Sequence, residues 1–367
     1  MNRLNSVSTH DPLPRRQSYT VWNFNNKILN NTVFSRRGLV NLGNTCYMNS
    51  VMQVLNATAL ANTFLANEYM DQLPNKEGKY SRVVNAFAYI IRELRRVGCD
   101  FAVSCSPFKK AIGDIYEPFD NSRQQDANEF LRVLLDALHT GMNVNANNKT
   151  PLEEIDNTKG TDDALARAYW WQYAQRNSSF IVDTCGFQER SLLTCPQCGY
   201  QTRSFSATFG VEIPIPNLGT SQNIENCLTH YCRQEVLDNS SMYLCAGCKK
   251  KVNATKQLQF HTTPQVLFIT LKRFRTYGDF STAAKVNDPI LFGEHLDLKP
   301  FMSSEFSKTK YRLVGVVNHQ GNMHGGHYTA DAVGEDGAWF RFSDDVVQYA
   351  TQPDACLAYI LCYQRLQ

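Results

Sequence analysis

Cys46 is the side chain in this sequence best suited to nucleophilic chemistry. It follows a loop with two glycines, residues 38–45, and begins a segment whose apolar residues recur at helical spacing as far as Ala59. We expect a helix that starts at Cys46, capped by a side-chain oxygen of Asn44 or Thr45. The positive end of the helix dipole would favour the thiolate, which is the nucleophilic form. On its own, the segment fits a buried packing cysteine better, because free cysteine is among the most buried residue types.

A second segment, near the other end of the chain, favours a catalytic role for Cys46 over a packing role. Residues 318–326 form a polar, glycine-rich stretch, and His327 follows it at the start of an expected strand. Cysteine hydrolases combine a cysteine with a distant histidine that is adjacent in space rather than in sequence. The chain has eight histidines. Those outside any motif are assigned to the surface or to packing: His10, His139, His230, His261 and His295.

Two pairs of cysteines have the spacing of metal ligands. Cys195 and Cys198 form one C-x-x-C pair, Cys245 and Cys248 form another, and residues 199–244 separate them. A single pair also fits a redox motif, but two pairs supply the four thiolates of a tetrahedral site, which suits zinc. Because all four ligands are protein sulfurs, we expect one structural zinc ion. The other cysteines apart from Cys46 are assigned to packing: Cys99, Cys105, Cys185, Cys227, Cys232, Cys356 and Cys362.

The segments around Cys46 and His327 resemble the cysteine box and the histidine box of the ubiquitin-specific protease family, the cysteine deubiquitinases of peptidase family C19. The two segments are residues 38–50, GLVNLGNTCYMNS, and residues 318–330, NHQGNMHGGHYTA. The resemblance extends from Gly38 to about Leu366, nearly the whole chain. It implies a papain-like α+β fold with a helical thumb, a palm sheet and zinc-bearing fingers.

The resemblance also assigns roles at the reaction centre. Cys46 is the nucleophile, His327 is its base, and Asn41 lies where the family has a side-chain amide for the oxyanion hole. A donor aimed at developing negative charge typically removes about 3 kcal/mol from a barrier. Asparagine is also a common turn former, so it is the motif that favours the catalytic role. His319 and His324 are expected to line the cleft without transferring the proton.

The expected partner of His327 departs from the family pattern. The family usually has Asp or Asn followed by Asp, whereas this chain has Ser343 followed by Asp344. Residues 327–333 and 339–344 are expected to form a hairpin that brings these side chains to the histidine. Neighbouring strand residues point to opposite faces, so only one of the two should reach the imidazole, and the sequence leaves the register open. We hypothesise that the Ser343 hydroxyl accepts the Nδ1–H bond of His327, while Asp344 acts on the field or the oxyanion region.

Residues expected to bind the substrate come from two motifs. Asp126 and Glu129 lie in the first turn of an expected helix, where acidic residues are also ordinary dipole partners. The resemblance to the family's Gln-x-Asp-x-x-Glu-Phe box implies that both pair with arginines of the ubiquitin tail. The glycines before His327 fit a narrow passage for a substrate backbone. The substrate-binding residues expected on this basis are Gln124, Asp126, Glu129, Gly325, Gly326 and Tyr328.

The elements that must position these residues change type along the chain. Apolar spacing predicts helices over residues 83–94, 126–138 and 162–174, the last with Trp170 and Trp171 as packing anchors. Strand patterns follow over residues 209–216, 266–271, 311–317 and 358–363. Helices first and strands later indicate an α+β protein. The expected division is a flexible tail over residues 1–37 and a catalytic domain over residues 38–367, with a thumb over about 38–180, fingers over about 188–262 and a palm in the remainder.

Composition excludes several other classes of protein. With 37 basic and 34 acidic residues, the 367-residue chain has a net charge of +3 and no clustered basic stripe for nucleic acid. It has no apolar run of about 18 residues that would span a membrane. Residues 1–20 are polar and lack the apolar core of a signal peptide. We therefore expect a cytoplasmic or nuclear protein, or one found in both compartments.

These observations favour a thiol-dependent hydrolase that cleaves after the terminal glycine of ubiquitin. Its expected partners are ubiquitin, ubiquitinated proteins and a regulatory protein, without nucleic acid or membrane. One alternative is the same chemistry on another ubiquitin-like modifier, although the intact acidic residues of the Gln box favour ubiquitin. Another is a catalytically weak ubiquitin-binding scaffold, which the unusual Ser343 suggests. The intact Cys46, His327 and Asn41 argue against a scaffold.

Overall fold

The computed structural model describes residues 36–216, 218–238, 241–275, 284–305, 308–322, 325–334 and 336–366. The tail expected over residues 1–37 lies outside this part of the chain except for Arg36 and Arg37, and so do His10 and His324. The described residues belong to one compact unit. No helix within these ranges is long and apolar enough to cross a lipid bilayer.

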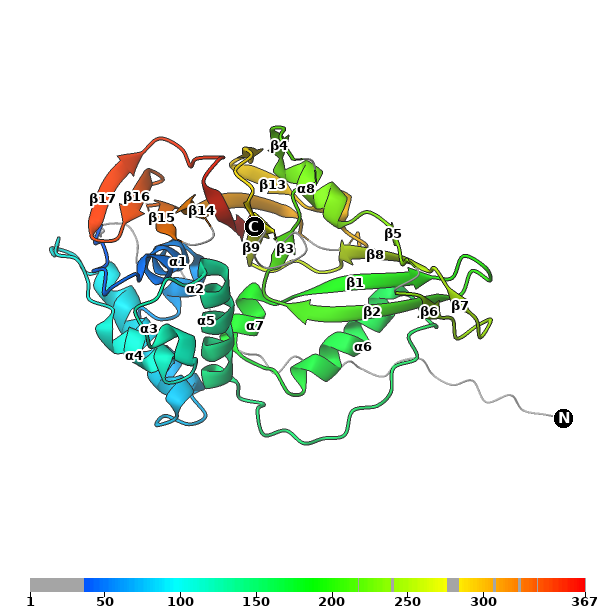
Figure 1. Ribbon diagram of the computed structural model, residues 1–367. Coiled ribbons are helices and arrows are strands. Elements are labelled where there is room, and N and C mark those ends of the chain that lie inside the picture. Colours follow the sequence, from blue (N-terminus) through cyan, green and yellow to red (C-terminus); the bar gives the residue numbers. More distant parts are fainter. Residues whose placement is uncertain are drawn as a thin grey trace. The chain divides into compact units, whose positions relative to one another are not determined.

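Most helices precede the first long strand, as the apolar spacing predicted. α1 (Cys46–Asn56) is buried along nearly its whole length, because it lies between the large sheet and the neighbouring helices (Figure 1). α3 (Lys79–Leu94) and α5 (Ala127–Met142) each turn an apolar face to the same core. The remaining helices are α2 (Ala59–Asn62), α4 (Ser106–Gly113), α6 (Asp162–Ala174), α7 (Phe180–Cys185) and α8 (Ile224–Tyr231).

The start of α1 differs from the sequence prediction. Thr45 occupies the cap position, but its hydroxyl accepts the backbone N–H of Leu42 at 2.9 Å instead of a helix amide. The side-chain oxygen of Asn41 accepts the N–H of Thr45 at 3.2 Å. The expected side-chain cap is therefore wrong, because the cap residue's hydroxyl is used to close the preceding loop.

An eight-stranded sheet forms the palm. Its strand order is β17-β16-β15-β14-β18-β9-β3, with β13 also paired to β14, and all neighbours are antiparallel except β3 and β9. Helix α1 packs against β14, β15 and β16, which brings Cys46 to the sheet. The strands are β3 (Val211–Ile213), β9 (Val266–Leu271), β13 (His295–Asp297), β14 (Lys310–Gly321), β15 (Gly326–Val333), β16 (Trp339–Ser343), β17 (Val346–Ala350) and β18 (Ala358–Arg365).

A smaller sheet, with the order β2-β1-β8-β5, forms the fingers (Figure 1). Helix α6 packs against β2. Its strands are β1 (Phe187–Thr194), β2 (Gln201–Thr208), β5 (Glu235–Val236) and β8 (Thr255–Phe260). Short strand pairs complete the fold: β4 (Gln222–Asn223) with β12 (Ile290–Leu291), β6 (Tyr243–Leu244) with β7 (Lys251–Val252), and β10 (Phe274–Arg275) with β11 (Ala284–Lys285).

The predicted α+β class is confirmed, but two packing assignments are wrong. Trp171 is 49% exposed, because the buried stripe of α6 is formed by Leu165 and Ala166 on another side of the helix. Cys356 is exposed, because it lies in the loop before β18 rather than in a strand or helix.

Candidate active site

Cys46 lies where the helical region meets the large sheet. It is the first residue of α1, and only 5% of its surface is exposed. Its thiol accepts a hydrogen bond from the backbone N–H of Tyr328, the residue after His327 on β15. The cysteine and histidine segments, distant in sequence, therefore meet at the contact between α1 and β15.

The thiol of Cys46 is held mainly in its protonated form in the free protein. Burial raises its pKa above the usual value, and the negative charge of Asp344 raises it further. The backbone N–H groups of Tyr328 and Tyr47 oppose this rise without outweighing it. The helix N-terminus does favour the thiolate, as predicted, but the desolvation of a buried anion exceeds this effect, so the net pKa of Cys46 is raised. Formation of the thiolate requires a base.

His327 and Ser343 lie on the hairpin of β15 and β16, which forms as predicted. Nε2 of His327 lies 2.9 Å from the Ser343 hydroxyl, and the two groups share a hydrogen bond. The sequence hypothesis placed this bond at Nδ1, whereas the structure places it at Nε2. With Nε2 as the donor, Nδ1 keeps the lone pair that can accept a proton.

Asp344 makes contacts different from those of its neighbour Ser343. Its backbone is left-handed, with φ 54°, a conformation that aspartate tolerates better than most residues. Its Oδ2 accepts a hydrogen bond from Nδ2 of Asn41 and its Oδ1 accepts one from Nδ2 of Asn49, each at 2.8 Å. Within the described residues, Ser343 thus contacts the imidazole and Asp344 contacts two asparagines.

The side-chain amide of Asn41 is held at both ends. Its Oδ1 accepts the backbone N–H groups of Gly43 at 2.9 Å and Thr45 at 3.2 Å, while its Nδ2 donates to Asp344. An amide nitrogen carries two protons, so one remains for a ligand. A donor whose orientation is fixed before the reaction is what an oxyanion hole requires.

Gln124 fixes the strand just before His327. Its Oε1 accepts the N–H of Gly326 at 3.0 Å, and its Nε2 donates to the carbonyl of the same residue at 3.1 Å. A Cβ at Gly326 would lie 2.4 Å from Nε2 of His319, so only glycine fits. His319 is 4% exposed and packs beneath this strand, so the expectation that it lines the cleft is wrong. Burial lowers the pKa of His319 to about 4, which keeps it neutral.

Asp126 and Glu129 have different surroundings. Asp126 caps α5 by accepting the N–H of Glu129 at 2.9 Å, and it also accepts the hydroxyls of Tyr359 at 2.7 Å and Tyr328 at 3.3 Å. Burial raises the pKa of Asp126, although these donors oppose the rise. Glu129 is exposed and accepts the hydroxyl of Tyr116 at 2.5 Å. The sequence did not single out Tyr359, because β18 showed only the pattern of a buried strand.

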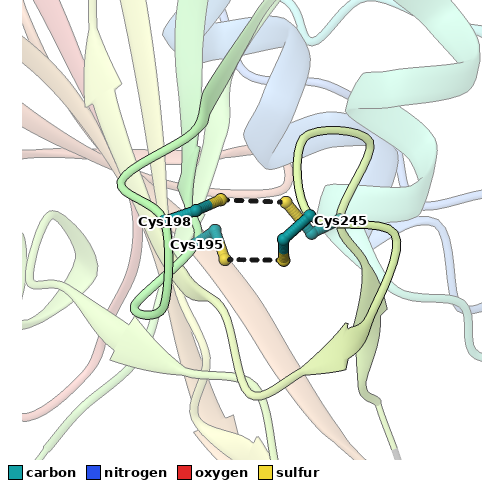
Figure 2. A group of neighbouring side chains, drawn as sticks. Cys195, Cys198 and Cys245 are labelled. Atoms are coloured by element: carbon teal, nitrogen blue, oxygen red, sulfur yellow. Dashed lines mark hydrogen bonds between the residues drawn. The ribbon is translucent and has the colours of Figure 1, made fainter.

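The four cysteines of the two C-x-x-C pairs converge near the ends of the fingers (Figure 2). Their Sγ atoms all lie within 4.8 Å of one another. The Sγ atoms of Cys195 and Cys248 are 3.9 Å apart, and those of Cys198 and Cys245 are 3.6 Å apart. Tetrahedral zinc with Zn–S bonds of about 2.3 Å would place its sulfurs about 3.8 Å apart. The four-sulfur set therefore fits a metal ion of this size and geometry.

The chain is similar to known proteins over most of its length. A family model described as ubiquitin carboxyl-terminal hydrolase matches residues 37–363. The chain is 33% identical over 335 residues to ubiquitin carboxyl-terminal hydrolase 2 of Bos taurus, covering 89% of this chain and 54% of that protein. It is 29% identical over 352 residues to ubiquitin carboxyl-terminal hydrolase 21 of Homo sapiens, covering 90% and 61%. The chain thus spans little more than half the length of these curated relatives.

The fold also matches a solved structure, the SAGA DUB module Ubp8/Sgf11/Sus1/Sgf73 bound to monoubiquitin. The TM-score is 0.71 at 22% identity, and the match covers 90% of this chain and 69% of the other. The family model spans both the cysteine and the histidine segments. The chain therefore belongs to the ubiquitin carboxyl-terminal hydrolase family, as its resemblance to the ubiquitin-specific proteases predicted.

Proposed function

We propose that the chain is a deubiquitinase that uses Cys46 to hydrolyse the peptide or isopeptide bond after the C-terminal glycine of ubiquitin. The observation that carries the proposal is the contact of the Cys46 thiol with the strand of His327, whose imidazole bonds Ser343. Membership of the ubiquitin carboxyl-terminal hydrolase family supports this reaction. The structural relative bound to monoubiquitin supports ubiquitin as the ligand.

In the proposed reaction, the first step is a proton transfer from the thiol to the imidazole. Nδ1 of His327 accepts the proton of Cys46, while Nε2 stays bonded to Ser343. The thiolate attacks the carbonyl carbon of the terminal glycine, and a tetrahedral oxyanion forms. The imidazolium then returns its proton to the leaving amine, and water hydrolyses the thioester by the same steps.

The oxyanion is stabilised by donors that are already in place. The second Nδ2 proton of Asn41 is one, and Asp344 fixes the direction of that amide. The backbone N–H groups of the first turn of α1 are proposed as further donors, because the first amides of a helix have no partner within the helix. Asp344 therefore has its proposed role at the oxyanion, and Ser343 has its role at the imidazole.

The substrate tail is proposed to lie along the start of α5 and β15. Glu129 presents an exposed carboxylate that suits an arginine of the ubiquitin tail. Asp126 is already bonded by three donors, so its proposed role is to hold Tyr328 in the wall of the channel. Gly325 is proposed to leave room for the substrate backbone, whereas Gly326 is required by its packing against His319.

Zinc is the metal proposed for the four-cysteine cluster. Four sulfur donors leave no position for a catalytic water, so the ion would be structural. It would join the turn between β1 and β2 to the turn between β6 and β7, and thereby stiffen the end of the fingers. A regulatory protein partner is also proposed, with support from the Ubp8 relative, whose solved module includes Sgf11, Sus1 and Sgf73.

Replacing one proposed ligand should release the metal. Cys198→Ser is expected to reduce zinc from one ion per chain to a small fraction, and to lower Tm by at least about 4 °C because the finger turns lose their cross-link. Elemental analysis and thermal unfolding measure these changes. Cys356→Ser, which removes an exposed cysteine outside the cluster, is the matched control. Equal zinc contents in the two variants would refute the assignment.

The hydroxyl of Ser343 is expected to make a modest contribution to turnover. Ser343→Ala should lower kcat about threefold to tenfold with little change in KM, because a neutral hydrogen bond contributes about 0.5–1.5 kcal/mol. Ser343→Thr, which keeps the hydroxyl, should retain most of the activity. Steady-state hydrolysis of a fluorogenic ubiquitin substrate measures both constants. An unchanged kcat in Ser343→Ala would contradict the proposed role of this hydroxyl in turnover.

The proposed function is tested with ubiquitin that carries a C-terminal electrophile. The wild-type chain should form a covalent adduct with this probe and should hydrolyse a fluorogenic ubiquitin substrate. Parallel probes built on other ubiquitin-like modifiers should react far more slowly. Labelling only by another modifier's probe would identify that modifier as the substrate, and labelling by none would leave a binding scaffold.

A further inference from the structure

An ion pair between a buried carboxylate, that of Asp331, and a partly exposed guanidinium, that of Arg341, joins the two strands of the hairpin that carries His327 and Ser343. Asp331 on β15 has no exposed surface and lies directly opposite Arg341 on β16. Arg341 donates to both carboxylate oxygens, from Nε at 2.7 Å and from Nη2 at 2.9 Å. Asn318 on β14 donates a third bond, to Oδ2 at 2.7 Å. A bidentate pair of this kind fixes the relative position of two strands along their length as well as their separation.

This pair lies on the face of the hairpin that carries His327 and Ser343. Side chains alternate between the two faces of a strand, so Asp331 shares a face with His327, and Arg341 shares a face with Ser343. The regular pairing of β15 with β16 ends at Ala330 and Phe342. His327 and Ser343 thus lie beyond the last ladder pair, and their approach depends on the register set further along the hairpin.

The burial of the Asp331 carboxylate supports a function in specifying this register. Burial removes the Asp331 carboxylate from water, a cost that its donors must offset, and an apolar residue of similar volume is often at least as stable. A slip of one residue would move Ser343 to the opposite face, away from the imidazole. An apolar pair resists such a slip weakly, whereas a misplaced buried carboxylate would lose all three of its donors.

We propose that Asp331 and Arg341 are positioning residues, which fix the hairpin register that sets the Ser343 hydroxyl against Nε2 of His327. This inference rests on the proposed deubiquitinase function. Neither side chain is assigned a contact with the substrate or with the reacting atoms. Their effect on turnover should therefore pass through the bond between His327 and Ser343.

A double-mutant cycle tests this coupling. Asp331→Asn is expected to lower kcat about threefold to tenfold, with KM changed less than about twofold, because the loss cannot exceed that of the hydrogen bond it positions. In a Ser343→Ala background, the same substitution should lower kcat by less than about twofold. Rates are normalised to the fraction of folded chain. Arg312→Gln, which breaks the exposed pair of Arg312 with Glu294 on the same sheet, is the matched control and should have no effect.

A neutral replacement pair should restore the register. Asp331→Asn combined with Arg341→Gln can form two amide hydrogen bonds across the strands. Among the described residues, the buried Oδ1 of Asn318 has no hydrogen-bond partner, so a flipped Asn318 amide can accept the new N–H at position 331. We expect this double variant to recover kcat to within about twofold of wild type.

An NMR signal separates this inference from the proposed function. A slowly exchanging Nε2 proton of His327 should be present in the wild type and lost in both Ser343→Ala and Asp331→Asn. If the wild type fails to hydrolyse ubiquitin, the proposed function fails, while this signal still tests the register. Equal losses of kcat from Asp331→Asn with and without Ser343 would overturn the inference, and so would an unchanged imidazole signal in the single variant.

Discussion

Cys46→Ala should abolish covalent labelling by a ubiquitin probe and should lower kcat by at least about 10⁴-fold, since the loss of a nucleophile removes the covalent route altogether. The side chain is buried and small, so the substitution leaves only a minor cavity. Ubiquitin binding should therefore persist, and Kd measured by calorimetry or fluorescence anisotropy should change little. Intact-mass spectrometry after incubation with the probe measures the labelling.

Cys105→Ala is the matched control for this prediction. Cys105 is also fully buried at the start of a helix, and burial raises its pKa to about 12. It directly precedes α4, whereas Cys46 lies at the contact between α1 and β15. This variant should label like the wild type after correction for folded protein. A ubiquitin adduct that survives in Cys46→Ala would show that another residue is the nucleophile.

Asp344→Asn should have opposite effects on turnover and on the reactivity of the free thiol. Asparagine tolerates the left-handed backbone and keeps the size of the side chain, but it is uncharged and can accept from only one of Asn41 and Asn49. Loosening the Asn41 amide is expected to lower kcat about 10²-fold, near the cost of one oxyanion donor.

The same substitution should make the thiol of Cys46 more acidic. The charge of Asp344 raises the pKa of this thiol, so its removal lowers that pKa. At any pH below the pKa, the thiolate fraction increases, and alkylation by a small haloacetamide should be faster than in the wild type. Asp345→Asn, at the exposed neighbouring position, should change neither the alkylation rate nor kcat. Parallel decreases in alkylation and turnover would instead assign Asp344 to activation of the thiol.

The candidate catalytic and metal-binding residues could be predicted from the sequence because each lies in a short motif with a characteristic spacing. The loop and helix around Cys46, the strand that begins at His327 and the two C-x-x-C pairs each carry their own pattern. The change from helical to strand periodicity also predicted the α+β class. These features depend on short-range backbone preferences, which one sequence displays directly.

The features that sequence did not reveal depend on tertiary contacts. Tyr328 and Tyr359 reach Asp126 from strands that are distant along the chain. The choice of Nε2 on His327 and the pairing of Asp331 with Arg341 depend on the exact register of the hairpin, which the sequence left open. The acidity of Cys46 was misjudged for a related reason. The helix dipole can be anticipated from the start of α1, whereas the burial that outweighs it arises only when the sheet covers the helix.

Because the thiol of Cys46 is buried and protonated, it should resist oxidation by peroxide. Peroxide reacts with thiolates that solvent reaches, and repeated reaction carries cysteine through sulfenic to irreversible sulfinic and sulfonic acids. A nucleophile with 5% of its surface exposed and an elevated pKa resists the first of these steps. In the proposed mechanism, the sulfur becomes a reactive thiolate only when His327 removes its proton in the presence of substrate, so oxidation of the resting protein should be slow.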